Sequence, residues 1–308
     1  MTKPTVIVAY YSTYGHIKQL AHKVVEGLNS AGNVNVKLYQ IKETLSNEVL
    51  AKMHAPPQDT SVPFLTPEIL GEADAFLLGM PTRYGSMPAQ VKAFWDSTGG
   101  LWHDGKLVGK MGGMFFSTAS QSGGQETTAL VSLTNFVHHG IIYVPLGFTH
   151  NNLFDLTEVI GGSAYGAGTV AAGDGSRQPS AKELEVAVHQ GKSFAAIAFW
   201  DSTGGLWHDG KLVGKMGGMF FSTASQSGGQ ETTALVSLTN FVHHGIIYVP
   251  LGFTHNNLFD LTEVIGGSAY GAGTVAAGDG SRQPSAKELE VAVHQGKSFA
   301  AIVAKYHN

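Results

Sequence analysis

Three short polar segments of the chain carry the residues most suited to ligand binding. They read Ser12-Thr13-Tyr14-Gly15-His16-Ile17, Pro81-Thr82-Arg83-Tyr84 and Ser117-Thr118-Ala119-Ser120-Gln121-Ser122-Gly123. Hydroxyl groups and free backbone N–H groups at the start of a helix can hold a phosphate without a strong cation. The first segment lacks the lysine of an ATP-binding P-loop, and no G-x-G-x-x-G pattern follows a strand. Its residue types predict a phosphate site, although an ordinary polar turn fits the same spacing.

Four side chains, Arg83 of the second segment and three outside the segments, are candidates for chemistry, and each has a plain structural alternative. Arg83 fits a solvated surface charge, Trp102 fits a core position, and His138-His139 fits a pair that satisfies carbonyls at a helix end. Adjacent histidines are poor joint metal ligands, and no matching set of acidic residues accompanies them. No nucleophile elbow and no zinc-type spacing occur.

Apolar runs and helical periodicity alternate along the chain and place these segments. Short apolar runs predict strands over residues 5–11, 34–41, 75–79, 110–116 and 141–144, each followed by a helical pattern. Thr66-Pro67-Glu68 opens a helix, Ser180 and Glu183 form a capping box, and residues 146–179 form a long glycine-rich excursion. This order predicts a doubly wound α/β fold with a five-stranded parallel sheet. All three polar segments then follow the carboxyl ends of strands, where such sheets bind ligands.

Six ordered motifs within residues 5–197 resemble the WrbA-type NAD(P)H:quinone oxidoreductases, which are flavodoxin-like FMN proteins. The motifs are the three polar segments, the third of them extended to Glu126, together with Thr98-Gly99-Gly100-Leu101-Trp102, His138-His139-Gly140 and residues 173–180. The segment at 117–124 contains less glycine than that family pattern. The resemblance implies FMN as cofactor, NAD(P)H as electron donor, a quinone as substrate and a homotetramer.

The resemblance also implies a role for each candidate residue. Residues 12–17 would hold the FMN phosphate, and Pro81, Thr82, Arg83 and Tyr84 would contact the isoalloxazine. Residues 117–123 would approach the ring and the ribityl chain. Trp102 would form an aromatic wall for nicotinamide or quinone. His138 would approach the substrate side of the flavin, as a binding and catalytic residue, from a neighbouring subunit.

Residues 93–197 are repeated without one change as residues 198–302. We refer to these stretches as copy 1 and copy 2. Removing one of them leaves 203 residues, the size of a single domain. We therefore expect a flavodoxin-like FMN-binding domain over residues 1–197 and an incomplete half domain over 198–308. Copy 1 has unbroken connectivity to the first 92 residues, so we expect it to complete the sheet and copy 2 to expose apolar strand edges.

The composition excludes several classes of protein. The chain has 19 basic and 23 acidic residues, a formal net charge of −4 and no cysteine. The chain lacks the excess of basic residues that is typical of nucleic-acid-binding proteins. Because it has no cysteine, disulfide and thiol chemistry are ruled out. No run of apolar residues is long enough to span a bilayer, and the N-terminus has no signal-peptide layout, so we expect a cytoplasmic protein. Two other functions stay open: a single-electron carrier, and a scaffold that the repeat has made non-catalytic.

Overall fold

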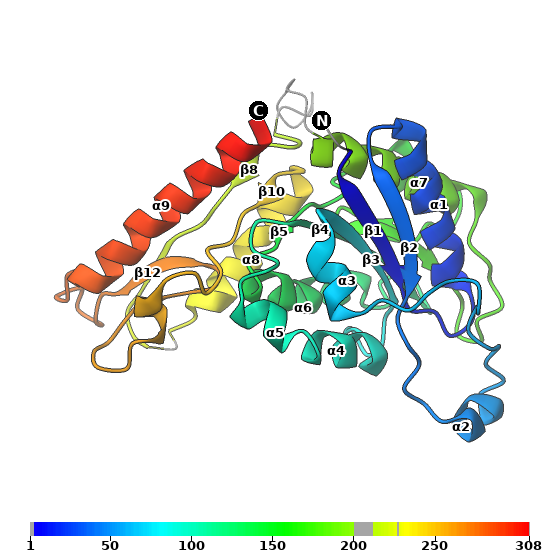
Figure 1. The fold of residues 1–308 in the computed structure, drawn as a ribbon, viewed down its shortest axis with the longest axis horizontal. Helices are drawn as coiled ribbons and strands as arrows, with labels where there is room; N and C mark the ends of the chain where they lie inside the picture. Colours follow the sequence, from blue (N-terminus) through cyan, green and yellow to red (C-terminus); the bar gives the residue numbers. More distant parts are fainter. Residues whose placement is uncertain (1–2, 200–211, 227, 308) are drawn as a thin grey trace.

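The computed structural model describes residues 3–199, 212–226 and 228–307 (Figure 1). The earlier elements are β1 Thr5–Tyr10, α1 His16–Ala31, β2 Asn35–Gln40, α2 Asn47–Lys52, α3 Pro67–Glu72, β3 Ala75–Pro81, α4 Ala89–Asp96, α5 Gly99–His103, β4 Met111–Thr118, α6 Gln125–His138, β5 Ile142–Tyr143, the 3-10 helix η1 Asn151–Phe154, β6 Gly162–Ser163, β7 Gly166–Val170 and α7 Ala181–Phe199. The later elements are β8 Met216–Gly217, β9 Phe221–Thr223, α8 Gln230–His243, β10 Ile247–Tyr248, the 3-10 helix η3 Asn256–Phe259, β11 Gly267–Ser268, β12 Gly271–Val275 and α9 Ala286–His307.

The central sheet has the strand order β2-β1-β3-β4-β5, and these neighbours all pair in parallel. This is the flavodoxin-like order, and all five predicted strands are present. Helices α1 and α7 cover one face, where Ile17, Leu20 and Val186 pack against Val8 and Leu77. Helices α4 and α6 cover the other face. The sheet is therefore buried on both sides, as the continuous apolar strands require.

The outer edge of β4 is shared by two short strands rather than by one. Met111 and Gly112 pair with β5, whereas Phe116 to Thr118 pair with β7. Strand β7 was missed in the sequence because residues 146–179 contain so many glycines. Its glycines serve close packing: a Cβ atom on Gly166 would lie 2.0 Å from the carbonyl oxygen of Met114. The glycine-rich segment therefore adds strand β7 to the sheet, beside the predicted binding segments.

Two predicted helix starts are confirmed in atomic detail. The side chain of Thr66 accepts a hydrogen bond from the N–H of Ile69 at the start of α3. At the start of α7, Ser180 and Glu183 exchange hydrogen bonds between side chain and backbone, as in a capping box. The carboxylate of Glu183 also accepts from the N–H groups of Gly161 and Val170. This buried carboxylate therefore ties the glycine-rich excursion to α7.

Copy 2 does not form a second sheet of the same kind. The stretch that forms the single strand β4 in copy 1 forms only β8 and β9 in copy 2, because β3 has no counterpart beside it. Strand β10 pairs with β8 and, antiparallel, with β5 of copy 1. The sheet consequently continues past the five predicted strands. The sequence from Phe194 to Asp201 also predicts that the last helix of copy 1 continues across the junction of the copies, and the part of this stretch beyond Phe199 lies outside the described residues.

The two copies meet through equivalent residues. Tyr143 of β5 pairs with Tyr248 of β10, its own counterpart in the repeat. The ring of His138 lies 5.1 Å from that of Phe253, and the reciprocal pair of Phe148 and His243 lies at 5.3 Å. Such reciprocal contacts are typical of a two-fold interface between identical surfaces. Copy 2 is therefore attached to copy 1 at a self-complementary surface.

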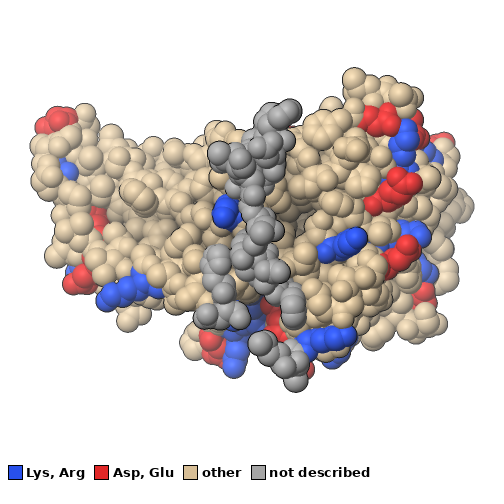
Figure 2. Space-filling view, turned by 90° about the horizontal axis from the view of Figure 1, so that it is seen from above, with Lys and Arg blue, Asp and Glu red and all other residues tan. Residues whose placement is uncertain are grey.

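The last helix adds one contact that has no equivalent in the repeat. The hydroxyl of Tyr306, four residues beyond copy 2, donates a hydrogen bond of 2.8 Å to the carbonyl of Gly109. On the face seen in Figure 2, basic side chains lie among acidic ones. None of the helices among the described residues has the length and hydropathy needed to cross a membrane.

Candidate functional site

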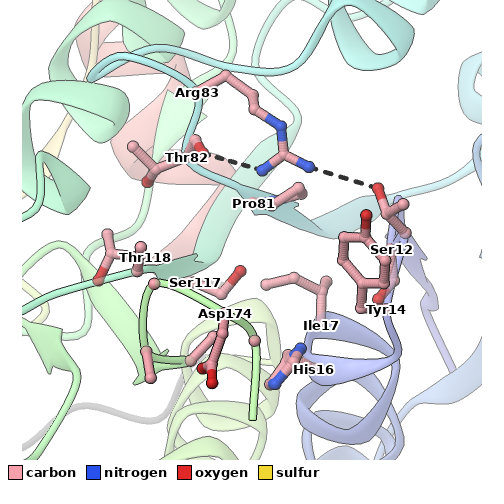
Figure 3. Close-up of a pocket in the computed structure, with 16 residues that line it drawn as sticks. Ser12, Tyr14, His16, Ile17, Pro81, Thr82, Arg83, Ser117, Thr118 and Asp174 are labelled. Atoms are coloured by element: carbon pink, nitrogen blue, oxygen red, sulfur yellow. Dashed lines mark hydrogen bonds between the residues drawn. The ribbon is translucent and has the colours of Figure 1, made fainter. Parts of the chain in front are cut away.

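A cavity of about 270 Å³ lies beyond the carboxyl ends of β1, β3, β4 and β7. Figure 3 shows Ser12, Tyr14 and His16 on one side of it, Arg83 across its rim, and Ser117 and Asp174 opposite. Its lining brings together parts of all three predicted segments. The lining residues are Ser12, Thr13, Tyr14, His16, Ile17, Pro81, Thr82, Arg83, Ser117, Thr118, Ala119 and residues 171–175.

The N-terminus of α1 opens into this cavity without a side-chain cap. The N-cap residue Gly15 has a φ of 92°, and no side chain accepts a hydrogen bond from the first turn. The first turn also contains no acidic residue. Ser12 Oγ accepts only from the N–H of Gly15, one residue before the helix begins. The free N–H groups of the first turn and the positive end of the helix dipole are therefore available to an anion.

Arg83 spans the rim of the cavity between β3 and β1. Its guanidinium donates to the carbonyl of Thr82 at 3.0 Å and to Thr13 Oγ1 at 3.4 Å. The Thr13 hydroxyl in turn donates to the hydroxyl of Tyr11, and Tyr11 donates to Glu43. A cation is thus held over the pocket by a hydrogen-bonded chain that reaches into the protein.

This chain of hydrogen bonds shifts the pKa values of its buried members. Burial and the neighbouring carboxylate of Glu43 raise the pKa of Tyr11 to about 12, so its hydroxyl stays protonated. Burial acts to raise the pKa of Glu43, but hydrogen bonds from Leu45 N–H and from the Tyr11 hydroxyl outweigh it and keep that pKa low. The network therefore presents a fixed charge pattern behind Thr13 and Arg83 over the neutral pH range.

Residues 171–175 form a wall of the cavity that was not among the predicted site residues. They follow β7, and Ala172 adopts a φ of 66° while Gly175 N donates to its carbonyl. Asp174 accepts from the N–H and hydroxyl of Ser176, and these hydrogen bonds lower its pKa. The Gly-Asp-Gly turn was visible in the sequence. Its place in the site depends on strand β7, which the sequence pattern does not reveal.

Several predicted residues lie outside the lining. Tyr84 has a φ of 52° and a fully exposed side chain, at a turn in which Arg83 and Ser86 pair. The loop that continues from Ala119 turns away: Gly123 N donates to the Ser120 carbonyl, and Ser122 has a φ of 53°. The residues concerned are Gly15, Tyr84, Ser120, Gln121, Ser122 and Gly123. Gly15 still shapes the pocket, because it begins α1.

Trp102 and His138 lie together in a different cavity of about 400 Å³. Both side chains contact Phe253 of copy 2, at ring distances of 6.2 and 5.1 Å. Partial burial lowers the pKa of His138, against the effect of Glu231 from copy 2. The structure of one chain therefore does not bring these two residues into the pocket at α1, and their predicted catalytic roles stay predictions.

Comparison with known proteins gives consistent matches. The family described as NADPH-dependent FMN reductase matches residues 2–152. A quinone-oxidoreductase, QR2, from Triphysaria versicolor is 56% identical over 193 residues, which are 62% of this chain and 94% of that protein. The NAD(P)H quinone oxidoreductase PST3 from Candida albicans is 52% identical over 193 residues, 62% of this chain and 96% of that protein.

The matched length of these relatives is close to that of the chain without one copy of the repeat. The minor allergen Alt a 7 of Alternaria alternata, for example, is 54% identical over 194 residues and 95% of its length. Among solved structures, a WrbA-like flavodoxin from Agrobacterium tumefaciens is 23% identical, covering 64% of this chain and 98% of its own, with a TM-score of 0.40.

Proposed function

The chain belongs to the NAD(P)H quinone oxidoreductase family, and from this premise we propose that it reduces quinones by two electrons, taken from NAD(P)H and passed through FMN. The observation that carries the proposal is the uncapped N-terminus of α1, which opens into the cavity beside Arg83. FMN supplies the hydride chemistry when bound, and the protein binds and orients it.

The residues of the pocket suit the different parts of FMN. The N–H groups of residues 16 and 17, with the hydroxyl of Ser12, would hold the monophosphate beside Thr13, and a phosphate needs no lysine at a helix N-terminus. Thr82, Arg83 and Ser117 to Ala119 would line the flavin, and Arg83 would favour a negative charge on it. Residues 171–175 would close the opposite wall. Tyr84 and residues 120–123 would act at the rim, where a bound nicotinamide or quinone arrives.

We further propose that residues 1–197 are the FMN-binding domain and that residues 198–308 are an incomplete half domain. Pairing of β3 with β4 along its whole length supports this division. We also propose a cytoplasmic homotetramer in which Trp102 and His138 act on the flavin of another subunit. Because Phe253 already packs against both side chains, copy 2 would compete with that subunit contact. Sedimentation of the full-length chain tests this, with tetramers expected only if copy 2 is displaced.

The function is tested with one pair of matched variants in the full-length chain. Ala119 and its counterpart Ala224 in copy 2 are both exposed, but Ala119 lines the pocket. A tryptophan at position 119 fills the pocket, so Ala119→Trp should weaken FMN binding by about tenfold or more. Ala224→Trp should bind FMN like the unmodified chain. Binding is measured by fluorescence titration of FMN.

The same proteins are then assayed for oxidation of NADH with excess FMN and a benzoquinone. Quinone-dependent turnover that is lost in Ala119→Trp and kept in Ala224→Trp would support the proposal. FMN binding without any turnover would instead favour a single-electron carrier. A chain that takes up no FMN would favour a non-catalytic scaffold.

A further inference from the structure

Helix α9 of copy 2 exposes a face that copy 1 covers with the N-terminal part of the chain. In copy 1, α7 crosses α1 at two glycines: a Cβ atom on Gly191 would lie 2.1 Å from the carbonyl oxygen of Val24. In copy 2 the equivalent Gly296 has nothing within 4 Å of that position. Leu289 and Val293, on the same helix, are 54% and 57% exposed. Figure 1 shows α9 at the opposite end of the molecule from α1.

The strand edge beside α9 is open in the same way. In copy 1, residues 75–81 of β3 pair with β4, and Phe115 is fully buried against Gly79 and Ile17. In copy 2, β9 pairs with β12 alone among the residues that the structure describes, and the equivalent Phe220 is 83% exposed. We call Phe220, Leu289, Val293 and Gly296 the acceptor face. The segment that covers its equivalent in copy 1 is residues 5–92.

Copy 2 also keeps its half of the pocket in the conformation seen in copy 1. Ala277 has a φ of 64°, against 66° for Ala172, and the hydrogen bond from Gly280 N to its carbonyl has the same 3.2 Å length. Glu288 is buried and pairs with Arg282, as Glu183 pairs with Arg177. The turn that would face α1 is therefore already formed.

We propose that the acceptor face binds residues 5–92 of a second copy of this chain, and that the resulting complex contains a second flavin pocket. The flavin part rests on the function proposed above. The occupant follows from the repeat, because the acceptor face has the same residues as the surface that residues 5–92 cover in copy 1. The charged residues are also complementary. In copy 1, Lys23 and Glu26 of α1 line a groove together with Glu185 and Lys192 of α7. Their counterparts Glu290 and Lys297 line the open groove of α9, where they could meet the same α1 residues.

Each chain has one N-terminal segment and two surfaces that fit it. A chain that donates its segment leaves its own copy 1 uncovered, and this surface can accept a segment from a third chain. Two chains that donate their segments to each other close into a dimer, whereas donation in one direction continues from chain to chain. The proposal therefore predicts oligomers held together by the N-terminal segment, from a reciprocal dimer upward.

The test uses two full-length chains with different tags, expressed together. The donor carries Gly191→Leu and Gly296→Leu, so neither of its own surfaces can hold its N-terminal segment. The acceptor is the unmodified chain, and the matched control acceptor carries Gly296→Leu alone. Because Gly296 has open space around it, this substitution leaves the control acceptor itself intact.

We expect the donor to co-purify with the unmodified acceptor and to raise bound FMN from one to two molecules per acceptor chain. Retention on the Gly296→Leu acceptor should be lower by about tenfold or more. Equal retention on both acceptors, or none on either, would overturn the docking proposal. Docking with one FMN per acceptor would overturn the second pocket. An unmodified acceptor without any FMN would refute the proposed function instead, while co-purification would still report docking.

A second measurement tests the proposal without the donor variant, in case that variant fails to fold. Two differently tagged unmodified chains are unfolded together in urea and refolded, and the same is done with two Gly296→Leu chains. Mixed oligomers that form with the unmodified chains and are reduced by Gly296→Leu support the proposal. Equal amounts of mixed oligomers in the two experiments contradict it.

Discussion

Copy 1 and copy 2 have the same sequence of 105 residues but fold into different structures. The stretch from Met111 to Thr118 forms one continuous strand between two neighbours, whereas its repeat is split into β8 and β9. The turn after β7 and the turn after β12, by contrast, match closely. Features that depend on contacts between residues near each other in the sequence therefore form in both copies. Features that depend on packing against residues 5–92 form in copy 1 and are lost in copy 2.

The largest expected difference between the copies concerns their equivalent phenylalanines. Phe115→Ala removes a fully buried ring and should cost about 4 kcal/mol of unfolding free energy. Phe220→Ala changes a side chain that is 83% exposed and should change the unfolding free energy by no more than about 0.5 kcal/mol. Urea unfolding followed by fluorescence measures both. Similar losses for the two variants would mean that copy 2 has a packed core of its own.

The buried glutamates should behave alike in the two copies. Glu183 accepts hydrogen bonds from Gly161, Val170 and Ser180, and Glu288 accepts the equivalent ones from Gly266, Val275 and Ser285. Each also pairs with an arginine six residues earlier. Replacing either by glutamine breaks a buried ion pair and should cost about 3 kcal/mol locally.

Hydrogen exchange of the amides that donate to each glutamate measures these local losses. Equal loss of protection around Gly161 and around Gly266 would confirm that the network forms without residues 5–92. A much smaller effect of Glu288→Gln would show that the network of copy 2 depends on that segment after all.

The sequence predicted the features that are local or strongly periodic. The five strands, the helix that begins at Pro67 and the capping box of Ser180 and Glu183 are all present. Three binding segments were predicted to meet, and parts of each line one cavity, because parallel strands bring their carboxyl ends to one edge.

What the sequence did not predict depends on contacts between distant segments. Strand β7 was hidden by glycines whose purpose, close packing on Met114, appears only in three dimensions. Tyr84 was expected in the site, but its side chain is fully exposed, at a turn where its φ is positive. Trp102 and His138 contact Phe253, a residue of the repeat that no local pattern connects to them.

Acidification should destabilise copy 1 through His139. Burial, with a smaller effect of His138, lowers the pKa of His139 to about 4, and its Nε2 lies 2.9 Å from Thr98 Oγ1. The folded state therefore favours the neutral ring. The stabilisation is complete above the usual histidine pKa of about 6.5 and is lost as the pH falls from there toward 4, with about 2 kcal/mol lost by about pH 5.

The measurement is the unfolding free energy at about pH 7.5 and at about pH 5, for the unmodified chain and for His139→Gln. The variant should lose about 2 kcal/mol of the pH dependence in this window, because glutamine does not titrate, whereas His138, His189 and His294, whose pKa values burial also lowers, still contribute. An unchanged slope would assign the acid sensitivity to groups other than His139.

The smallest expected effect concerns Tyr306, which ties the end of copy 2 to copy 1 from outside the repeat. Its hydroxyl donates to the carbonyl of Gly109, and burial, with the charge of Asp74, raises its pKa to about 12. Tyr306→Phe keeps the ring and should cost about 1 kcal/mol, seen as faster hydrogen exchange and proteolysis at the end of α9. Tyr84→Phe, at a fully exposed ring, is the matched control. If Tyr306→Phe behaves like that control, then this hydrogen bond does not hold α9 in place, and copy 2 is held by the pairing of β5 with β10 and by side-chain packing such as that of Trp102 and His138 on Phe253.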